Sequence, residues 1–369
     1  MVLKNRRTLA TTASYSASTT STISLPRDFL IQRINLSFVG TTVNSGLAAL
    51  VSGAPFSLMK YVRVKAVGEG SSRTIYEVKG EDFGNLNLFQ YGKAVKNQHS
   101  PTATGTCTNG LQFFGTIDMR TDFGDPDDFS VAVPSYLLST LQLEIEWDTV
   151  ALGYGTNNTS VNGTLTVSLV EGIPESSDPD FSTNPLQTTL YKELNGDSSS
   201  GSTEQFSTFF NVGSLIRTNF LITETSAGVL SDAEIEYYTV TSGNIPLISK
   251  QNFRDAKQQD VEDWGVPCGK TLFGDTNSST GTINTILYPL VNSPVIAGAG
   301  ATLTGGGQTI TGWTAIDFMN PKAPFIETEA GSEIDGLDTS SFNVGDLEIE
   351  LYKNSASSII RTIQISVEG

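Results

Sequence analysis

The amino-acid sequence predicts an all-β protein made of two tandem antiparallel β-sandwiches, each interrupted by one short helix. Three observations predict this fold class: the same landmarks occur twice in one order, apolar residues alternate with polar ones, and Gly, Ser, Thr and Asn are abundant. With 369 residues the chain is too long for one ordinary hydrophobic core. We therefore expect two domains of similar construction.

An internal repeat is the strongest signal, because a duplicated sequence decides the fold of both halves. Each match alone is weak, but five matches in the same order indicate an internal duplication. The matched landmarks, first half and then second half, are Leu30, Ile31 and Arg33 with Leu215, Ile216 and Arg217; Ile75, Val78 and Phe83 with Ile245, Ile248 and Phe253; Ile117 and Asp118 with Ile316 and Asp317; the LEIE segments 143–146 and 347–350; and the VEG segments 170–172 and 367–369.

The duplication divides the chain into four expected segments. We expect an N-terminal arm at residues 1–11, a first sandwich at residues 12–172, a linker at residues 173–201 and a second sandwich at residues 202–369. The linker is assigned from its Pro, Ser, Asp and Gly content, which is typical of surface connections.

Apolar residues recur at every second position in many segments of both halves. In residues 30–40, Ile34, Leu36 and Phe38 alternate with polar neighbours, and residues 61–68 follow the same rule. Alternation of this kind indicates strands with one face on a core. Seven or eight such strands per half, separated by Gly, Asn and Ser turns, are typical of an antiparallel sandwich.

One segment in each half breaks the alternation and predicts a short helix. These segments are residues 81–95 and residues 250–265, and both pass from an acidic or amide residue and an aromatic to an aromatic-Gly stop. In the second segment Ser249 or Asn252 can cap the start of the helix, and Gly265 can end it.

The charge balance disfavours a nucleic-acid-binding protein. The chain has 22 Lys and Arg against 39 Asp and Glu, a net charge of −17, so it gains little from releasing counterions on a polyanion. Lys4, Arg6 and Arg7 form the one basic cluster, which is either a solvated terminus or an arm that meets a negative surface. No apolar run approaches the ~18 residues of a membrane span, and the start lacks the apolar region of a secretory signal.

The sequence predicts no catalytic, cofactor-binding or metal-binding residues. His99 is the one histidine, and neither Cys107 nor Cys268 has a partner at metal-ligand spacing, which excludes a zinc finger and a His-based triad. We expect free thiols, although a disulfide between the two cysteines stays open. Nucleophile-elbow, phosphate-loop and dinucleotide-binding motifs are absent from the sequence, so no enzyme is expected.

Residues 122–128 form an acidic turn that has two interpretations. Asp122, Asp125, Asp127 and Asp128 offer enough carboxylate oxygens for Ca²⁺. Their spacing does not fit an EF-hand loop, which favours a solvated acidic turn.

Glu144 and Glu146, and their counterparts Glu348 and Glu350, could suggest the paired carboxylates of a glycosidase. The same arrangement in both halves, with apolar residues between the glutamates, instead indicates one polar face of a strand facing solvent or an interface.

Residues 23–41 (ISLPRDFLIQRINLSFVGT) and residues 58–68 (LMKYVRVKAVG) carry a family resemblance. Together with two sandwiches that each hold a helix at the same place, they resemble the double jelly-roll major capsid proteins of tailless icosahedral viruses. This lineage includes adenovirus hexon and several membrane-containing phages. The resemblance covers nearly the whole chain in architecture but only these short segments in sequence.

The resemblance implies two tandem eight-stranded jelly rolls and a structural role. Three chains would close a pseudo-hexameric homotrimer, a closed heterologous ring, and contact neighbouring trimers and minor capsid and vertex proteins. The protein would be made in the host cytoplasm and lie in the capsid shell of the virion, without a small-molecule substrate. Residues 97–110 and 291–312 would be tower or intersubunit loops, and the arm with Lys4, Arg6 and Arg7 would face an internal membrane or the genome.

Two alternatives remain open from the sequence. A carbohydrate-binding tandem sandwich would need exposed aromatic residues in a groove, such as Trp147, Trp264 or Trp313. Their places beside the ends of strands or helices instead suggest core positions. The other alternative is a phage tail, fibre or surface-layer protein built from repeated sandwiches.

Overall fold

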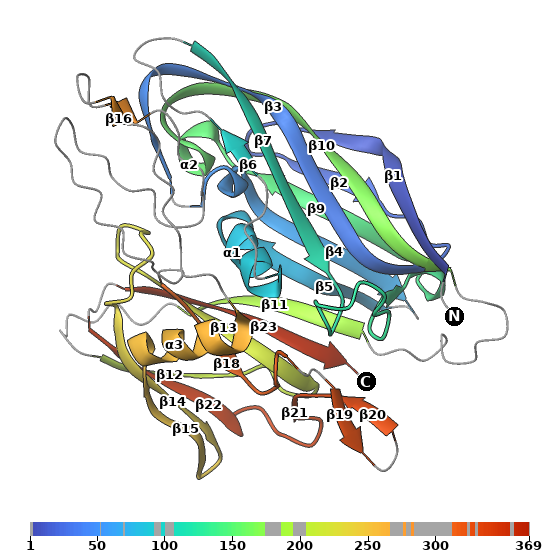
Figure 1. Cartoon of the computed structure of the whole chain (residues 1–369), viewed down its shortest axis with the longest axis vertical. Helices are drawn as coiled ribbons and strands as arrows, with labels where there is room; N and C mark the ends of the chain where they lie inside the picture. Colours follow the sequence, from blue (N-terminus) through green and yellow to red (C-terminus); the bar gives the residue numbers. More distant parts are fainter. Residues whose placement is uncertain are drawn as a thin grey trace.

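The two halves of the chain fold as two β-sandwiches, which lie one above the other in Figure 1. We call them the first roll (residues 3–173) and the second roll (residues 186–368). The computed structural model describes residues 3–51, 53–68, 71–91, 97–99, 107–173, 186–194, 204–265, 276–277, 282–283, 312–322, 325–328, 331–354 and 358–368.

The first roll places a six-stranded sheet against part of a nine-stranded sheet. The six-stranded sheet contains, in spatial order, β1 (Leu3–Ser14), β10 (Gly155–Ile173), β3 (Leu30–Leu50), β7 (Cys107–Asp118) and β6 (Asn97–His99), with β8 (Val133–Pro134) beside β3. The facing strands are β5 (Ser71–Lys79), β4 (Met59–Gly68), β9 (Thr140–Trp147) and β2 (Thr20–Ser24).

The second roll completes the nine-stranded sheet and adds a four-stranded one. Its share of the larger sheet is β18 (Trp313–Asp317), β13 (Leu215–Glu224), β23 (Ile359–Glu368) and β11 (Leu186–Leu194), with β21 (Leu337–Asp338) beside β13. The smaller sheet contains β12 (Glu204–Phe209), β22 (Leu347–Lys353), β14 (Ile235–Ser242) and β15 (Ile245–Asn252). Two small hairpins are β16 (Thr276–Asn277) with β17 (Thr282–Ile283), and β19 (Phe325–Thr328) with β20 (Gly331–Ile334). The predicted all-β class with two sandwiches is confirmed.

The strands form where the sequence alternates, because alternation gives each strand one apolar face. Along β9 the side chains of Leu143, Ile145 and Trp147 are buried, while the glutamates between them are partly exposed. The equivalent strand β22 follows the same pattern. Each large apolar side chain removed from water stabilises the fold by about 1.5–3 kcal/mol.

The five landmarks of the sequence repeat lie in equivalent strands of the two rolls, apart from Phe83 and Phe253, which lie in the helices that follow the second pair of strands. β3 lies between β10 and β7, as β13 lies between β23 and β18. β4 lies between β9 and β5, as β14 lies between β22 and β15. The duplication expected from the sequence is therefore present in the topology.

The strand register corrects two residue matches within the repeat. Gly172 lies opposite Leu30, whereas Val367 lies opposite Leu215, so the match of the two VEG segments is wrong by two positions.

The second correction concerns Arg33. Arg33 pairs with Asp118, whereas Thr218 pairs with Asp317. A register shift of the β-bulge type leaves Gln32 opposite no residue of β10, and a corresponding shift leaves Arg217 opposite no residue of β23. Gln32 is thus the counterpart of Arg217, and the match of Arg33 with Arg217 is wrong by one position.

Both expected helices are present. α1 (Gly80–Tyr91) follows β5 and α3 (Phe253–Trp264) follows β15. Asn252 is the N-cap of α3, where its side chain accepts a hydrogen bond from the Arg254 backbone N–H, and Gly265 ends the helix with φ of 62°. None of the helices in the described ranges is long and apolar enough to cross a membrane.

Shorter helical turns were not expected from the sequence. α2 (Val150–Gly153) is one turn capped by the Thr149 side chain, and η1 (Phe56–Leu58) and η2 (Ser135–Leu137) are 3-10 turns. Elements this short leave little periodic signal in a sequence.

Two strands lie where we expected connecting segments. β1 covers most of the expected arm and pairs with β10, and β11 lies within the expected linker and pairs with β23. Their composition is polar enough to suggest loops, but pairing with a distant strand satisfies their backbone groups. The boundaries of the four segments and the count of eight strands per roll remain predictions.

Candidate functional site: the junction between the two rolls

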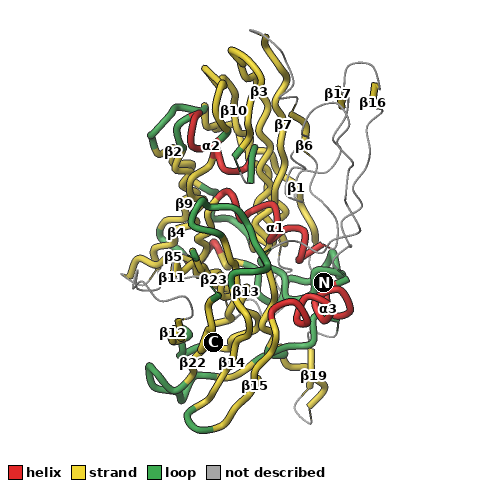
Figure 2. The backbone as a smooth tube through the Cα atoms, turned by 90° about the vertical axis from the view of Figure 1, so that its left-hand side faces the viewer, coloured by secondary structure: helices red, strands yellow, loops and turns green. Residues whose placement is uncertain are grey.

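One hydrophobic core extends from the first roll into the second. Its buried members include Phe89 of α1 together with Phe220 of β13 and Trp313 of β18. The ring of Phe89 lies 4.9 Å from that of Phe220, 6.0 Å from that of Trp313 and 5.9 Å from that of Trp264. In Figures 1 and 2, α1 lies in the middle of the molecule between the strands of the two rolls. Aromatic packing therefore joins the rolls.

The backbone also crosses the junction. β11 pairs antiparallel with β23 of its own roll and contacts β5 of the first roll in parallel, where Thr189 lies opposite Tyr76. An ion pair of 3.1 Å between Lys79 and Glu193 adds to this contact. The two rolls therefore share one continuous sheet.

A buried charged cluster lies at the same junction. Its centre is Arg361 of β23, whose side chain is 1% exposed and contacts Asp82 and Glu81 of α1 and Glu224 of β13. Burial disfavours the charged form of Glu224, and repulsion by Glu81 and Glu193 adds to this, so its pKa is raised to about 8. We call Arg361, Glu81, Asp82 and Glu224 the junction cluster.

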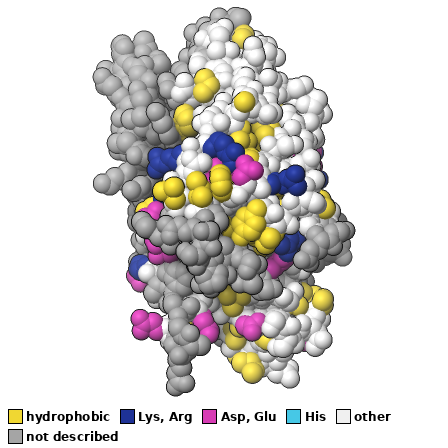
Figure 3. Space-filling model, turned by 90° about the vertical axis from the view of Figure 1, so that its right-hand side faces the viewer, with side chains coloured by type: hydrophobic (Ala, Val, Ile, Leu, Met, Phe, Trp, Pro, Cys, Tyr) yellow, Lys and Arg dark blue, Asp and Glu magenta, His cyan; other side chains and the backbone are white. Residues whose placement is uncertain are grey.

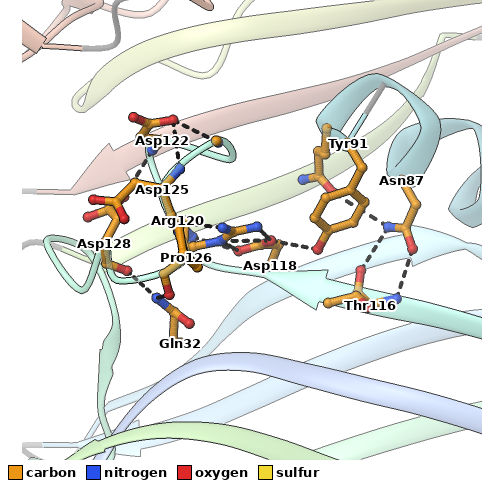
Figure 4. Close-up of polar contacts among 12 residues, drawn as sticks. Gln32, Asn87, Tyr91, Thr116, Asp118, Arg120, Asp122, Asp125, Pro126 and Asp128 are labelled. Atoms are coloured by element: carbon orange, nitrogen blue, oxygen red, sulfur yellow. Dashed lines mark hydrogen bonds and ion pairs between the residues drawn. The ribbon is translucent and has the colours of Figure 1, made fainter. Parts of the chain in front are cut away.

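A second buried arginine anchors a loop of the first roll. Arg217 of β13 is fully buried and donates hydrogen bonds to the Thr121 carbonyl (2.7 Å) and to Gln187 Oε1 (3.1 Å). Its counterpart Gln32 donates to the carbonyl oxygens of Pro126 (3.1 Å) and Asp128 (2.5 Å), as Figure 4 shows. The two bulged residues thus contact the two ends of residues 121–128. Burial lowers the pKa of Arg217 to about 10.

Each roll repeats one polar contact between a helix end and a strand end. Tyr91, the last residue of α1, donates to Asp118 Oδ2 at 2.5 Å (Figure 4), and Trp264, the last residue of α3, donates to Asp317 Oδ2 at 2.8 Å. Arg120 also binds the buried Asp118 through two nitrogens. The aromatic-Gly stops seen in the sequence therefore mark where each helix is fastened to its sandwich.

The acidic turn at residues 122–128 uses its carboxylates for the turn itself. Asp128 Oδ2 accepts the backbone N–H groups of Thr121 (2.8 Å) and Asp122 (2.9 Å), and Asp127 pairs with Lys4 at 2.9 Å. Burial alone would raise the pKa of Asp128. The hydrogen bonds that its carboxylate accepts, first of all from Ser130, have the larger combined effect, so the pKa of Asp128 is lowered. Within the described ranges, no group of three or more His, Cys, Asp and Glu residues is arranged to hold a metal ion.

The glutamates of the first LEIE strand form cross-strand ion pairs. Glu144 pairs with Lys65 at 2.7 Å, and Glu146 pairs with Lys60 and Arg63 of β4 at 2.9 Å each. The Lys60 ammonium leads the interactions that lower the pKa of Glu146. Both carboxylates are thus neutralised on the sheet face, an arrangement that suits a strand stripe rather than a glycosidase.

The second LEIE strand has the same glutamates but different neighbours. Glu348 and Glu350 lie opposite Thr241 and Thr239 of β14. The duplicated strand has therefore kept its glutamates, but the residues that lie opposite them on the neighbouring strand differ between the two rolls.

The N-terminal cations lie in β1 rather than in a free arm. Arg7 forms an ion pair of 2.5 Å with the fully buried Glu171, and Lys4 is paired with Asp127. Arg6 is exposed, and no ion pair is found for it in the residues that the structure covers. On the side where β1 begins and β23 ends, Figure 3 shows Lys and Arg side chains among hydrophobic and acidic ones. Of the three cations in the expected basic arm, Arg6 is exposed, whereas Lys4 and Arg7 are paired within the chain.

Several expected residues fall outside the described part. Cys268 and residues 291–311 are not covered, nor are residues 100–106 of the other insertion. Cys107 opens β7, but neither its side chain nor that of His99 is described. The redox state of the cysteines and the role of the insertions remain predictions.

The tryptophans do not form an exposed platform. Trp147 is 1% exposed and Trp313 is fully buried, and Trp264 packs against the ring of Phe220 at 5.6 Å. This is the core placement that we expected, and it removes the groove that a carbohydrate-binding sandwich would need from these three residues.

The junction cluster was not found from the sequence. The available signal was a charged residue directly after two apolar ones at the start of a strand, since Arg361 follows Ile359 and Ile360. Its partners Asp82 and Glu224 lie far away in the sequence, so only the fold brings the three together.

Comparisons with known proteins agree with this architecture. Neither a protein-family model nor a curated protein sequence matches the chain. Among solved structures, the STIV major capsid protein is similar over 99% of this chain and 97% of its own, with a TM-score of 0.64 and 15% identity. The major capsid protein P2 of bacteriophage PM2 is similar over 100% of this chain and 98% of its own, with a TM-score of 0.53 and 13% identity. The PBCV-1 virus capsid structure is similar over 100% of this chain and 94% of its own, with a TM-score of 0.57 and 9% identity. These similarities show that the chain has the double jelly-roll fold.

Proposed function

We propose that this protein is a viral major capsid protein, a structural subunit of an icosahedral shell rather than an enzyme. The observation that carries the proposal is the pair of topologically equivalent rolls joined by a shared core and a continuous sheet. Similar structures over almost the full length are those of major capsid proteins, which supports the same role here.

The geometry suits a ring of three chains. Two equivalent rolls per chain give a trimer six similar edges, so a closed heterologous ring can fill a hexagonal position. Such a ring closes only if the two rolls keep a fixed angle to each other. Three features hold that angle within each chain: the shared core, the β5–β11 contact and the junction cluster.

The partners follow from this role. Neighbouring trimers and minor capsid and vertex proteins would contact the trimer edges in the virion shell, after synthesis in the host cytoplasm. Contact with an internal membrane or the genome through the N-terminus would depend on Arg6, because Lys4 and Arg7 are already paired within the chain.

The alternative functions have less support. A carbohydrate-binding sandwich is disfavoured by the buried Trp147 and Trp313. A tail, fibre or surface-layer protein would not need an internal repeat whose two copies are locked to each other.

Size and shape measurements test the proposal. We expect light scattering to give the purified full chain a mass of three times 39.4 kDa, the mass of one chain. Negative-stain microscopy should show particles with hexagonal outlines. A monomer that binds sugars on a glycan array would overturn the proposal, and so would extended fibres.

A further inference from the structure

We propose that the junction cluster is a proton-controlled clamp between the two rolls. It holds them together while one of its carboxylates carries a proton, and it weakens when that proton leaves. This role does not depend on the shell function, because every group belongs to one chain.

The clamp is built from both rolls. Arg361 and Glu224 belong to β23 and β13 of the second roll, whereas Glu81 and Asp82 belong to the first turn of α1 in the first roll. The side chains of Arg361, Asp82 and Glu224 are 1%, 2% and 7% exposed. One buried guanidinium thus faces two buried carboxylates, Asp82 and Glu224, and the partly exposed Glu81, and it cannot balance all three.

The surroundings do not supply the missing positive charge. Besides Arg361 and Glu224, the titratable groups that face the cluster are Tyr61 of β4, Lys79 of β5, Glu81 and Asp82 of α1, and Tyr191 and Glu193 of β11. Burial raises the pKa of Tyr191, so this phenol stays neutral. The four carboxylates then face two cations, Lys79 and Arg361. Retaining a proton relieves this excess of negative charge.

A cleft gives solvent access to the cluster. It has a volume of about 480 Å³ and is lined by residues of both rolls, including Lys79 and Glu81 from the first and Val229 from the second. Glu81 is 29% exposed and lies 3.2 Å from Arg361. Protons can therefore reach Glu81, the member of the cluster that lines the cleft and contacts Arg361.

The direction of the pH effect follows from the raised pKa of about 8 at Glu224. The folded chain keeps a proton that the unfolded chain releases above the ordinary pKa of about 4.3. Stability from this group is therefore full at low pH and is lost as pH rises towards 8. The unfolding constant should increase by up to about tenfold per pH unit in this window.

Unfolding in urea between pH 5 and 9 tests the clamp. We compare the full-length chain with Glu224→Gln, and with Glu236→Gln as a control at an exposed carboxylate of β14. Relative to Glu224→Gln, the unfolding constant of the unmodified chain should rise by up to about tenfold per pH unit from pH 5 to 8. The Glu236→Gln control should follow the unmodified chain. Parallel curves for the unmodified chain and Glu224→Gln would overturn the proposal.

Hydrogen exchange locates the effect. Between pH 6 and pH 8.5, after correction for intrinsic rates, amides of β11 and β23 should lose protection relative to those of β3 and β10. Glu224→Gln should abolish this difference, whereas a loss spread evenly over both rolls would overturn the proposal. If Glu224→Gln does not fold, Glu81→Gln replaces it. That variant should move the transition to lower pH, and an unchanged transition would equally overturn the proposal.

Discussion

Glu171 shows how a single buried carboxylate can hold a terminal strand. Its side chain is fully buried in β10 and accepts hydrogen bonds from Arg7 Nε at 3.0 Å and from Asn5 Nδ2 at 3.2 Å. A buried charge left without its partner is strongly destabilising. β1 therefore forms the outer strand of the first sheet and also neutralises a charge that the sheet has buried.

We predict that Arg7→Ala lowers the free energy of unfolding by about 2–3 kcal/mol, because Glu171 loses its cation. Arg6→Ala, a matched change at the exposed neighbour, should change it by less than about 0.5 kcal/mol. Urea unfolding at pH 7 measures both values. Equal effects of the two variants would contradict this account of β1.

Two carboxylates, Asp260 of α3 and Asp317 of β18, give a further pH dependence. Asp260 Oδ1 accepts the Ala315 backbone N–H at 3.0 Å, and burial raises the pKa of Asp260 to about 7 and that of Asp317 to about 6. Each group binds a proton in the folded chain that the unfolded chain releases above about pH 4. Their contribution to stability is full below that pH and is lost as pH rises through 6 and 7.

Accordingly, Asp260→Asn should flatten the fall in melting temperature between pH 5 and pH 7.5. The amide can still accept the Ala315 N–H but carries no charge to desolvate. Differential scanning calorimetry across this range gives the slope. An unchanged slope in the variant would show that Asp260 ionises normally in the fold.

At the scale of elements, the sequence predicted the strands and helix ends that depend on local residue patterns. Alternation predicted the strands that contain Glu144 and Glu348. The sequence also predicted that α3 starts at Ser249 or Asn252 and ends at Gly265, and the structure has Asn252 as the N-cap. β1 and β11 were missed because their pairing partners are distant. Deleting residues 1–10 would consequently remove most of a sheet strand, not a free arm.

The junction cluster was missed for the same physical reason. Asp82, Glu224 and Arg361 each lie in a different element, and no local spacing relates them. The equivalence of Gln32 and Arg217 was missed for another reason. Arg217 was matched to the identical residue Arg33, although the matches of Leu30 with Leu215 and of Ile31 with Ile216 already place Gln32 at the position of Arg217.

The acidic turn at residues 122–128 should behave as a self-contained loop. Asp122 Oδ1 accepts the Gly124 N–H at 2.7 Å, and Asp125 Oδ1 accepts the Asp127 N–H at 2.8 Å, so these oxygens already have partners. We expect the same melting temperature with EDTA and with millimolar CaCl₂. A rise with calcium that disappears in Asp122→Asn would instead establish a calcium site.

At the scale of the whole molecule, the two rolls depend on each other. Phe220, Trp313 and Ile363 of the second roll belong to the same buried cluster as the core of the first roll. Separation would expose these side chains, each worth about 1.5–3 kcal/mol when buried.

We therefore predict that residues 1–173 and 186–369, expressed separately, do not form stable monomers. Each should aggregate or unfold at a lower urea concentration than the full chain, and co-expression should restore a soluble complex. Size-exclusion chromatography and circular dichroism would show this. Two independently stable halves would contradict a shared core.

The parallel contact between β5 and β11 has a mechanical consequence. A flexible tether lets two bodies swing apart under load, whereas a sheet that runs through both transmits the load along its hydrogen-bonded strands. Lateral force on one roll is thus passed to the other through the backbone as well as through side chains. This mechanical link is already present in a single molecule, before any neighbour is added.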